Sequence, residues 1–131
     1  MTIKLNHTGQ LFMQRQIAAG KVVRDERDAW SEHQPSTEEE NAFIETHGFA
    51  EYARWHLGID DREPAGTKAH YKFPCGDFKK VHRCGVISAE SRAGQYKHRD
   101  IETAAHRLHE LIDARVRRRA PSSAARSSRR T

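Results

Sequence analysis

The chain has 131 residues, of which 31% are charged and 36% are hydrophobic. Domains cluster at roughly 100 to 150 residues, so this length leaves room for one domain with a tail and excludes barrels and double dinucleotide-binding folds. No segment approaches the roughly 20 apolar residues of a membrane span, and the first residues lack the apolar run of a signal peptide. We therefore expect a soluble, cytoplasmic protein that makes no membrane contact.

The positive charge is concentrated at one end of the chain. The formal net charge of +5 combines 23 basic with 18 acidic residues. Residues 114–131 contain no acid and carry seven arginines, which are Arg115, Arg117, Arg118, Arg119, Arg126, Arg129 and Arg130. The remaining 113 residues hold 16 basic and 18 acidic side chains. We therefore expect a compact domain over residues 1–113 and an arginine-rich tail over 114–131, disordered beyond about residue 119.

The first third of the chain predicts one helix and a polar loop. Apolar spacing favours a helix over residues 8–19, which Gly20 ends. A brief extended piece over residues 21–24 follows. Residues 25–35 are polar apart from Trp30, which we expect to anchor this loop on the core.

The acidic middle of the chain predicts two short helices. Ser36 and Glu39 have the spacing of a capping box, so a helix is expected from there to about His47. A second helix over residues 49–57 places its apolar residues three and four apart. These two helices form the acidic hairpin over residues 36–57.

The second half predicts two longer helices. Turn-forming residues fill 60–69, and the alternation over 70–74 favours a short extended segment at an edge. A helix is expected from residue 78 to about 93, capped by Asp77, and another over 100–116. The apolar stripe of this last helix consists of Ile101, Ala104, Ala105, Leu108, Leu111 and Ile112. The fold class expected is therefore mainly α, a small bundle of about four helices with one short extended segment.

Three linked motifs resemble a known family. They are Trp55-His-Leu-Gly58-Ile-Asp60, Tyr71-Lys-Phe-Pro74-Cys-Gly-Asp77-Phe78 and Val81-His-Arg83. Over about residues 4–113 the chain resembles small bacterial proteins of similar length. Over about 55–113 it more distantly resembles a short helical segment attached to some tailed-phage head and prohead proteins. The resemblance implies one compact helical module with an optional tail, and it carries no activity, cofactor or catalytic residue. An aromatic residue often stands in that family where this chain has Cys75.

Cysteines and histidines in the second half are the strongest candidates for metal ligands. Cys75, His82 and Cys84, with His70 or His98 as a fourth group, are residue types that zinc prefers. Their spacing lacks the close pairs of structural zinc sites. On a helix over 78–93, His82 and Cys84 would also point to different sides. We therefore expect two buried free thiols, with no metal and no cofactor.

Neither a second metal site nor a catalytic site is expected. His106 and His109 lie three residues apart on the last predicted helix, where they could hold a transition metal, but nine histidines make such pairs common. Cys75, His82 and Asp77 supply the residue types of a nucleophilic triad without a surrounding motif of any such enzyme family. We therefore expect a protein that is not an enzyme.

Basic residues predict contact with a polyanion. Besides the seven tail arginines, a second basic group lies within residues 79–99 and consists of Lys79, Lys80, Arg83, Arg92, Lys97 and Arg99. Phosphate contact needs only charge, so the sequence predicts non-specific binding to nucleic acid or another polyanion. The alternative is a protein-interaction or phage-like assembly module that uses the acidic hairpin over residues 36–57.

Overall fold

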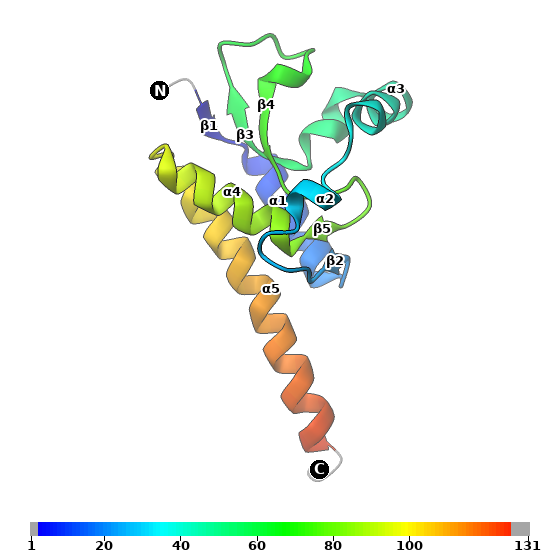
Figure 1. The fold of residues 1–131 in the computed structure, drawn as a ribbon, viewed down its shortest axis with the longest axis vertical. Coiled ribbons are helices and arrows are strands. Elements are labelled where there is room, and N and C mark those ends of the chain that lie inside the picture. Colours follow the sequence, from blue (N-terminus) through cyan, green and yellow to red (C-terminus); the bar gives the residue numbers. More distant parts are fainter. Residues whose placement is uncertain (1–2, 127–131) are drawn as a thin grey trace.

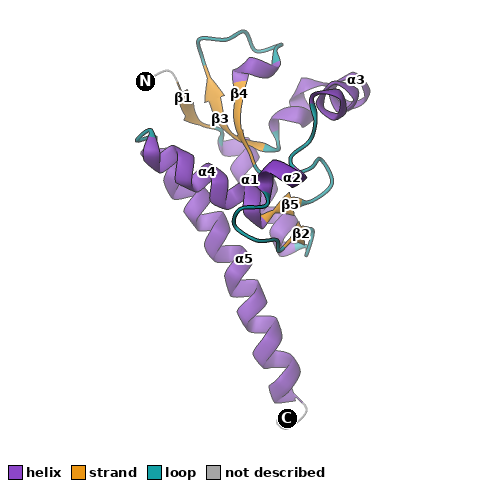
Figure 2. Ribbon diagram, viewed as in Figure 1, coloured by secondary structure: helices purple, strands orange, loops and turns teal. Residues whose placement is uncertain are grey.

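The protein combines helices with two small sheets. A computed structural model describes the backbone of residues 3–126 and the side chains of residues 3–114. Its helices are α1 (His7–Ala18), α2 (Trp30–His33), α3 (Thr37–Ala53), α4 (Arg83–Gln95), α5 (Arg99–Arg126) and the 3-10 turn η1 (Lys68–His70). Its strands are β1 (Ile3–Leu5), β2 (Val22–Val23), β3 (His56–Asp60), β4 (Tyr71–Pro74) and β5 (Val81–His82). The fold is therefore mixed α/β (Figure 2), and the prediction of a four-helix bundle was wrong.

The larger sheet includes the last two residues of the helix expected over residues 49–57. Its strand order is β1-β3-β4, with both neighbours antiparallel to the central strand. Leu5 pairs with Gly58, and Ile59 pairs with Tyr71. The apolar residues that end the predicted helix therefore belong to β3, because pairing with two distant strands outweighs local helical spacing. The edge position predicted for residues 70–74 is confirmed by β4.

A tight joint connects α1 to the start of β3. The side-chain amide of Asn6 donates to the carbonyl oxygens of Ala53 and His56, at 2.9 and 3.0 Å. A Cβ at Gly9 would lie 2.2 Å from the His56 oxygen, so only glycine allows this approach. The helix predicted over residues 8–19 is confirmed as α1, whose two ends each lie one residue earlier.

The capping box at the start of α3 is confirmed. The Ser36 hydroxyl accepts from the Glu39 amide at 3.1 Å, and the Glu39 carboxylate accepts from the Ser36 amide at 2.8 Å. The break expected between the two helices is a kink at Gly48, whose φ of 85° favours glycine. The helical segment after this kink ends at Ala53 rather than at residue 57.

The predicted start of α4 is displaced by five residues. Asp77 does cap a turn, because its Oδ1 accepts from the amides of Lys79 and Lys80 at 2.9 and 2.8 Å. The chain then forms β5 before α4 begins at Arg83. Strand pairing with β2 keeps residues 81 and 82 extended, so the helix cannot begin at residue 78.

The helices α4 and α5 form a hairpin (Figure 1) and supply 8 of the 15 residues of the core cluster. The apolar stripe predicted on the last helix is confirmed for the buried residues Ile101, Ala104, Ala105, Leu108 and Ile112, and its sixth member, Leu111, is partly buried. The backbone of α5 continues to Arg126, well past the predicted residue 116, and its last part leads away from the body (Figure 1). The prediction of disorder beyond about residue 119 falls partly on residues 127–131, which lie outside the described residues. Among the described helices, none has the length and apolarity that crossing a membrane requires.

Candidate metal centre

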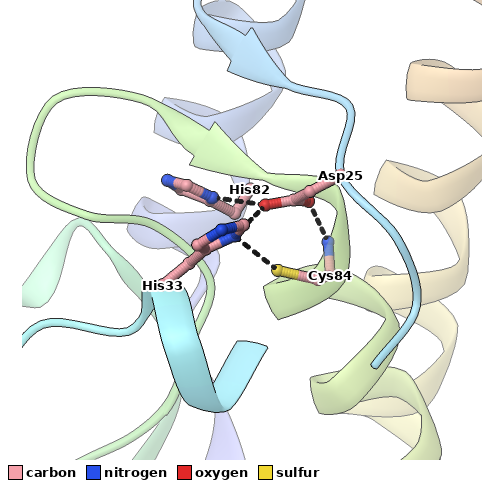
Figure 3. Close-up of side chains that lie close together, drawn as sticks. All are labelled: Asp25, His33, His82 and Cys84. Carbon is pink, nitrogen blue, oxygen red and sulfur yellow. Dashed lines mark hydrogen bonds and ion pairs between the residues drawn. The ribbon is translucent and has the colours of Figure 1, made fainter. Parts of the chain in front are cut away.

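Four side chains from three segments converge beside the two-stranded sheet that β2 and β5 form (Figure 3). Asp25 follows β2, His33 ends α2, His82 ends β5 and Cys84 lies in the first turn of α4. Each offers one ligand atom, and these atoms all lie within 4.8 Å of one another. The cluster is therefore the densest group of metal-ligand types in the described part of the chain.

The register of the small parallel sheet explains why Asp25 meets Cys84. Val22 pairs with Val81, and Val23 pairs with His82. Continuing both chains by two residues in the same direction brings Asp25 beside Cys84. The Cys84 amide accordingly donates to Asp25 Oδ1 at 2.7 Å. The Asp25 carboxylate therefore lies beside the first turn of α4, where the helix dipole favours negative charge.

One carboxylate oxygen of Asp25 sits at the centre of the cluster. Asp25 Oδ2 lies 2.7 Å from His33 Nδ1 and 2.6 Å from His82 Nδ1. The Cys84 sulfur lies 3.8 Å from the same His33 nitrogen. Figure 3 shows these contacts meeting in one small volume. Three donor types, namely oxygen, nitrogen and sulfur, therefore face one another.

Asp77 supports His82 from the opposite side of the ring. Its Oδ2 lies 2.8 Å from His82 Nε2, while its Oδ1 accepts the two backbone amides of the preceding turn. Burial opposes ionisation of Asp77, but the contact with His82 and those amides lower its pKa. A carboxylate behind a histidine is the usual arrangement at metal sites, because it fixes the ring and raises its basicity.

Among the described residues, no arginine or lysine contacts the four ligand side chains, and Arg83 reaches only the backbone carbonyl of Asp25, at 3.3 Å. Burial raises the pKa of the Cys84 thiol to about 12, and the neighbouring Asp25 adds to this rise. For Asp25 itself, burial opposes ionisation, but hydrogen bonds from His82 and the Cys84 amide lower its pKa to about 2. A negative carboxylate beside a neutral thiol would therefore gain from a divalent cation, which favours the thiolate.

A nucleophilic role for Cys84 is disfavoured by the same observations. Reactive cysteines need a lowered thiol pKa and partial exposure. The pKa of Cys84 is raised instead, and the residue is completely buried. The side chain of His33 is 36% exposed, so it is the member of the cluster most open to solvent.

The distances fit a zinc ion after a small expansion. Tetrahedral zinc holds nitrogen and oxygen ligands at about 2.0–2.2 Å, which separates them from each other by about 3.3 Å. A sulfur ligand at about 2.3 Å lies about 3.6 Å from a nitrogen ligand. The contacts of 2.6 and 2.7 Å would thus have to lengthen by less than 1 Å, whereas the sulfur–nitrogen distance of 3.8 Å already agrees.

Sequence reasoning found two of the four residues. His82 and Cys84 were expected on different sides of a helix. Because His82 ends a strand and Cys84 begins a helix, they share one site instead. Asp25 and His33 lie in the segment expected to be a polar loop, where no periodicity marks them. The sequence shows only that Asp25 and His33 are eight residues apart and that they follow the apolar pair Val22-Val23, and neither feature indicates a metal site.

The other predicted ligand candidates lie elsewhere. Cys75 is buried in the core, and its thiol donates to the Phe73 carbonyl at 3.5 Å. His70 Nδ1 contacts the Glu63 carbonyl at 2.8 Å. The buried Nδ1 of His98 has no hydrogen-bond partner among the described residues. Neither histidine therefore completes a site with the thiols.

The basic residues within 79–99 do not form one continuous patch. Lys79 and Lys80 precede the start of α4, whereas Arg92, Lys97 and Arg99 lie at or beyond its end. The 13 residues of α4 separate the two groups by roughly 20 Å. The sixth member, Arg83, donates to Asp113 at 3.0 Å and so forms an ion pair within the protein.

Comparison of the chain with family models, with curated proteins and with solved structures gives no match. The resemblance to small bacterial proteins and to a phage head-protein segment therefore stays a prediction, and the site is interpreted from its own geometry.

Proposed function

We propose that the protein binds one zinc ion through Asp25, His33, His82 and Cys84, and that this ion is structural. The observation that carries the proposal is the convergence of four ligand atoms within 4.8 Å of one another, from three segments of the chain. This proposal replaces our expectation from the sequence that no metal is bound.

The ligand set favours zinc among the common metals. One thiolate, two imidazoles and one carboxylate are the donors that zinc accepts, whereas magnesium and calcium prefer oxygen alone. Four protein ligands complete a tetrahedral shell and leave no position for a substrate, which is typical of structural sites. Asp77 supports the proposal because it would hold His82 through the nitrogen that does not bind the ion.

The ion would attach a weakly held segment to the core. Residues 24–29 have no regular structure and α2 has only four residues, so neither is stable by local hydrogen bonding. Trp30 is buried, and Gly85 leaves room for its ring, since a Cβ there would lie 3.0 Å from it. Zinc bound by Asp25 and His33 would fix both ends of this segment onto β5 and α4.

Metal analysis of the purified full chain, without a histidine tag, tests the proposal. We expect one zinc per chain after dialysis, and its loss in Cys84→Ser and His33→Gln. The matched controls are Cys75→Ser, which changes the other buried thiol, and His47→Gln, which changes an exposed histidine outside the cluster. A zinc content in both Cys84→Ser and His33→Gln that equals the content of the wild type would rule out this site.

A second candidate function, binding of nucleic acid or another polyanion, is favoured by the course of α5. The helix packs on the body through residues up to Ile112, and Asp113 forms ion pairs there with Arg83 and His109. The described backbone then leads away from the body up to Arg126, and residues 114–131 of the sequence hold seven arginines and no acid (Figure 1). A uniformly positive sequence of this kind suits phosphate contact.

Substituting Arg115, Arg117, Arg118 and Arg119 together by glutamine tests this second candidate. Binding to duplex DNA should weaken, and the slope of log affinity against log salt should fall by about 3 to 4. The control is Lys79→Gln with Lys80→Gln, which removes charge near the first turn of α4. An unchanged salt slope in the arginine variant would show that these four arginines make no phosphate contact.

A further inference from the structure

A second cluster of metal-ligand residues lies on the outer face of the α4–α5 hairpin. Glu90 of α4 faces His106 and His109, which are three residues apart and therefore adjacent on one side of α5. Glu90 Oε2 lies 2.8 Å from His106 Nδ1, and Glu90 Oε1 lies 2.9 Å from His109 Nδ1. The two helices thus hold two nitrogens and a carboxylate within 4.8 Å of one another.

Each histidine is also held from behind by a carboxylate one turn further along α5. His106 Nε2 lies 3.4 Å from Glu110, and His109 Nε2 lies 3.2 Å from Asp113. Asp113 is fixed in turn by Arg83 Nε at 3.0 Å. This arrangement repeats the pairing of Asp77 with His82: one nitrogen faces the cluster, and a carboxylate orients the other.

The charge around the cluster favours a cation. Three carboxylates, those of Glu90, Glu110 and Asp113, lie within 3.4 Å of the imidazole nitrogens of His106 and His109. His106 is exposed, with 57% of its side chain accessible, whereas Glu90 and His109 are about one-fifth exposed. A bound ion would therefore keep one side toward solvent, unlike an ion at the buried cluster.

We propose that Glu90, His106 and His109 form a second site for a divalent transition metal, with coordination positions open to water or to a ligand from another molecule. Two imidazoles and one carboxylate with open positions are a ligand set used for zinc and for other first-row metals. The site shares no residue with the buried cluster, so metal binding at the one can be tested independently of metal binding at the other.

Titration of the full chain with Co²⁺ under reducing conditions, without a histidine tag, tests this inference. The wild-type chain should bind two equivalents. One should show the charge-transfer absorption of a thiolate ligand, which only the Cys84 site can supply, and the other should lack it. The variant His106→Gln with His109→Gln should bind one equivalent and keep that absorption. Cys84→Ser should bind one equivalent without it.

Two further variants separate a specific site from general histidine binding. His47→Gln changes a histidine that also has a carboxylate, that of Glu51, one turn away at 3.6 Å, and it should bind both equivalents. Asp113→Asn should weaken only the second equivalent, by about 10-fold or more. The inference is overturned if the His106 and His109 double variant still binds two equivalents. It is equally overturned if the wild-type chain binds no equivalent beyond the one that Cys84→Ser removes.

Discussion

The two histidine clusters use similar groups in different surroundings. The cluster of Asp25, His33, His82 and Cys84 is built where strand, loop and helix meet, and the Cys84 side chain is completely buried. The cluster of Glu90, His106 and His109 lies on two helices that already pack through an apolar interface. Metal at the first cluster would hold the fold together, whereas metal at the second would sit on a fold that is complete without it.

Burial accounts for the different consequences expected at the two clusters. Removing one partner from a buried set of charges leaves the others without compensation and costs several kcal/mol, whereas exposed charges are compensated by water. Segment 24–33 has few other attachments, chiefly the packing of Trp30. The helices α4 and α5 instead share a continuous core. The stability of the protein should therefore depend on the first cluster and hardly on the second.

The largest expected effect is on thermal stability. Binding an ion at a free concentration of about 1,000 times its dissociation constant stabilises a protein by about 4 kcal/mol. For a domain of this size that corresponds to a rise of about 10 °C or more in the melting temperature. We expect a chelator to lower the wild-type melting temperature by this amount, measured by differential scanning calorimetry.

The effect of the chelator on the melting temperature of two variants shows which cluster holds the stabilising ion. Cys84→Ser should melt at the same temperature with and without chelator, whereas the His106 and His109 double variant should respond like the wild type. If the chelator shift persists in Cys84→Ser, or disappears only in the double variant, the structural ion is not at the buried cluster.

A smaller effect, on the affinity for zinc, is expected when the carboxylate that orients His82 loses its charge. Asp77→Asn removes the negative charge that orients His82, so the affinity for zinc should fall about 10-fold to 100-fold while the four ligands stay in place. Competition with a chromophoric chelator measures this change. Asp61→Asn is the control, since Asp61 forms only an exposed pair with Lys4. Equal affinities for Asp77→Asn and the wild type would show that His82 does not bind the ion through Nδ1.

The smallest effect concerns a buried histidine outside both clusters. His56 Nδ1 donates to the Tyr52 carbonyl at 2.9 Å, and burial lowers the pKa of His56 to about 4. The unfolded chain takes up this proton near pH 6.5, so stability falls as the pH drops from 6.5 toward 4. Between pH 7 and pH 5 the loss should be about 2 kcal/mol.

Urea unfolding with chelator present, at both pH values, measures this loss. His56→Gln should remove it, because glutamine can still donate to the Tyr52 carbonyl without taking up a proton. A variant that loses as much stability as the wild type over this range would assign the pH dependence to other groups, such as the histidines of the two clusters.

Local patterns predicted the elements that depend on local interactions. The capping box of Ser36 and Glu39 and the apolar stripe of α5 were found because three- and four-residue spacing is visible in the sequence. The strand β3 was missed because residues 49–57 also have helical spacing. Its strand conformation depends on β1 and β4, and neither pairing leaves a local signal.

The candidate site was missed for a related reason. An error of five residues in the start of α4 placed His82 and Cys84 on different sides of a helix, which removed the best argument for a metal. Asp25 and His33 reach the site through a parallel pairing of two-residue strands. Such a pairing is too short to produce alternation, so the sequence alone could not join the two halves of the cluster.

X-ray absorption at the zinc edge, on the chain dialysed to one zinc equivalent, tests whether the cluster of Asp25, His33, His82 and Cys84 holds the ion. We expect one sulfur neighbour at about 2.3 Å and three nitrogen or oxygen neighbours at about 2.0–2.2 Å. The sulfur neighbour should be present in Cys75→Ser and absent in Cys84→Ser. A wild-type spectrum with nitrogen and oxygen neighbours alone would contradict the assignment of zinc to the buried cluster.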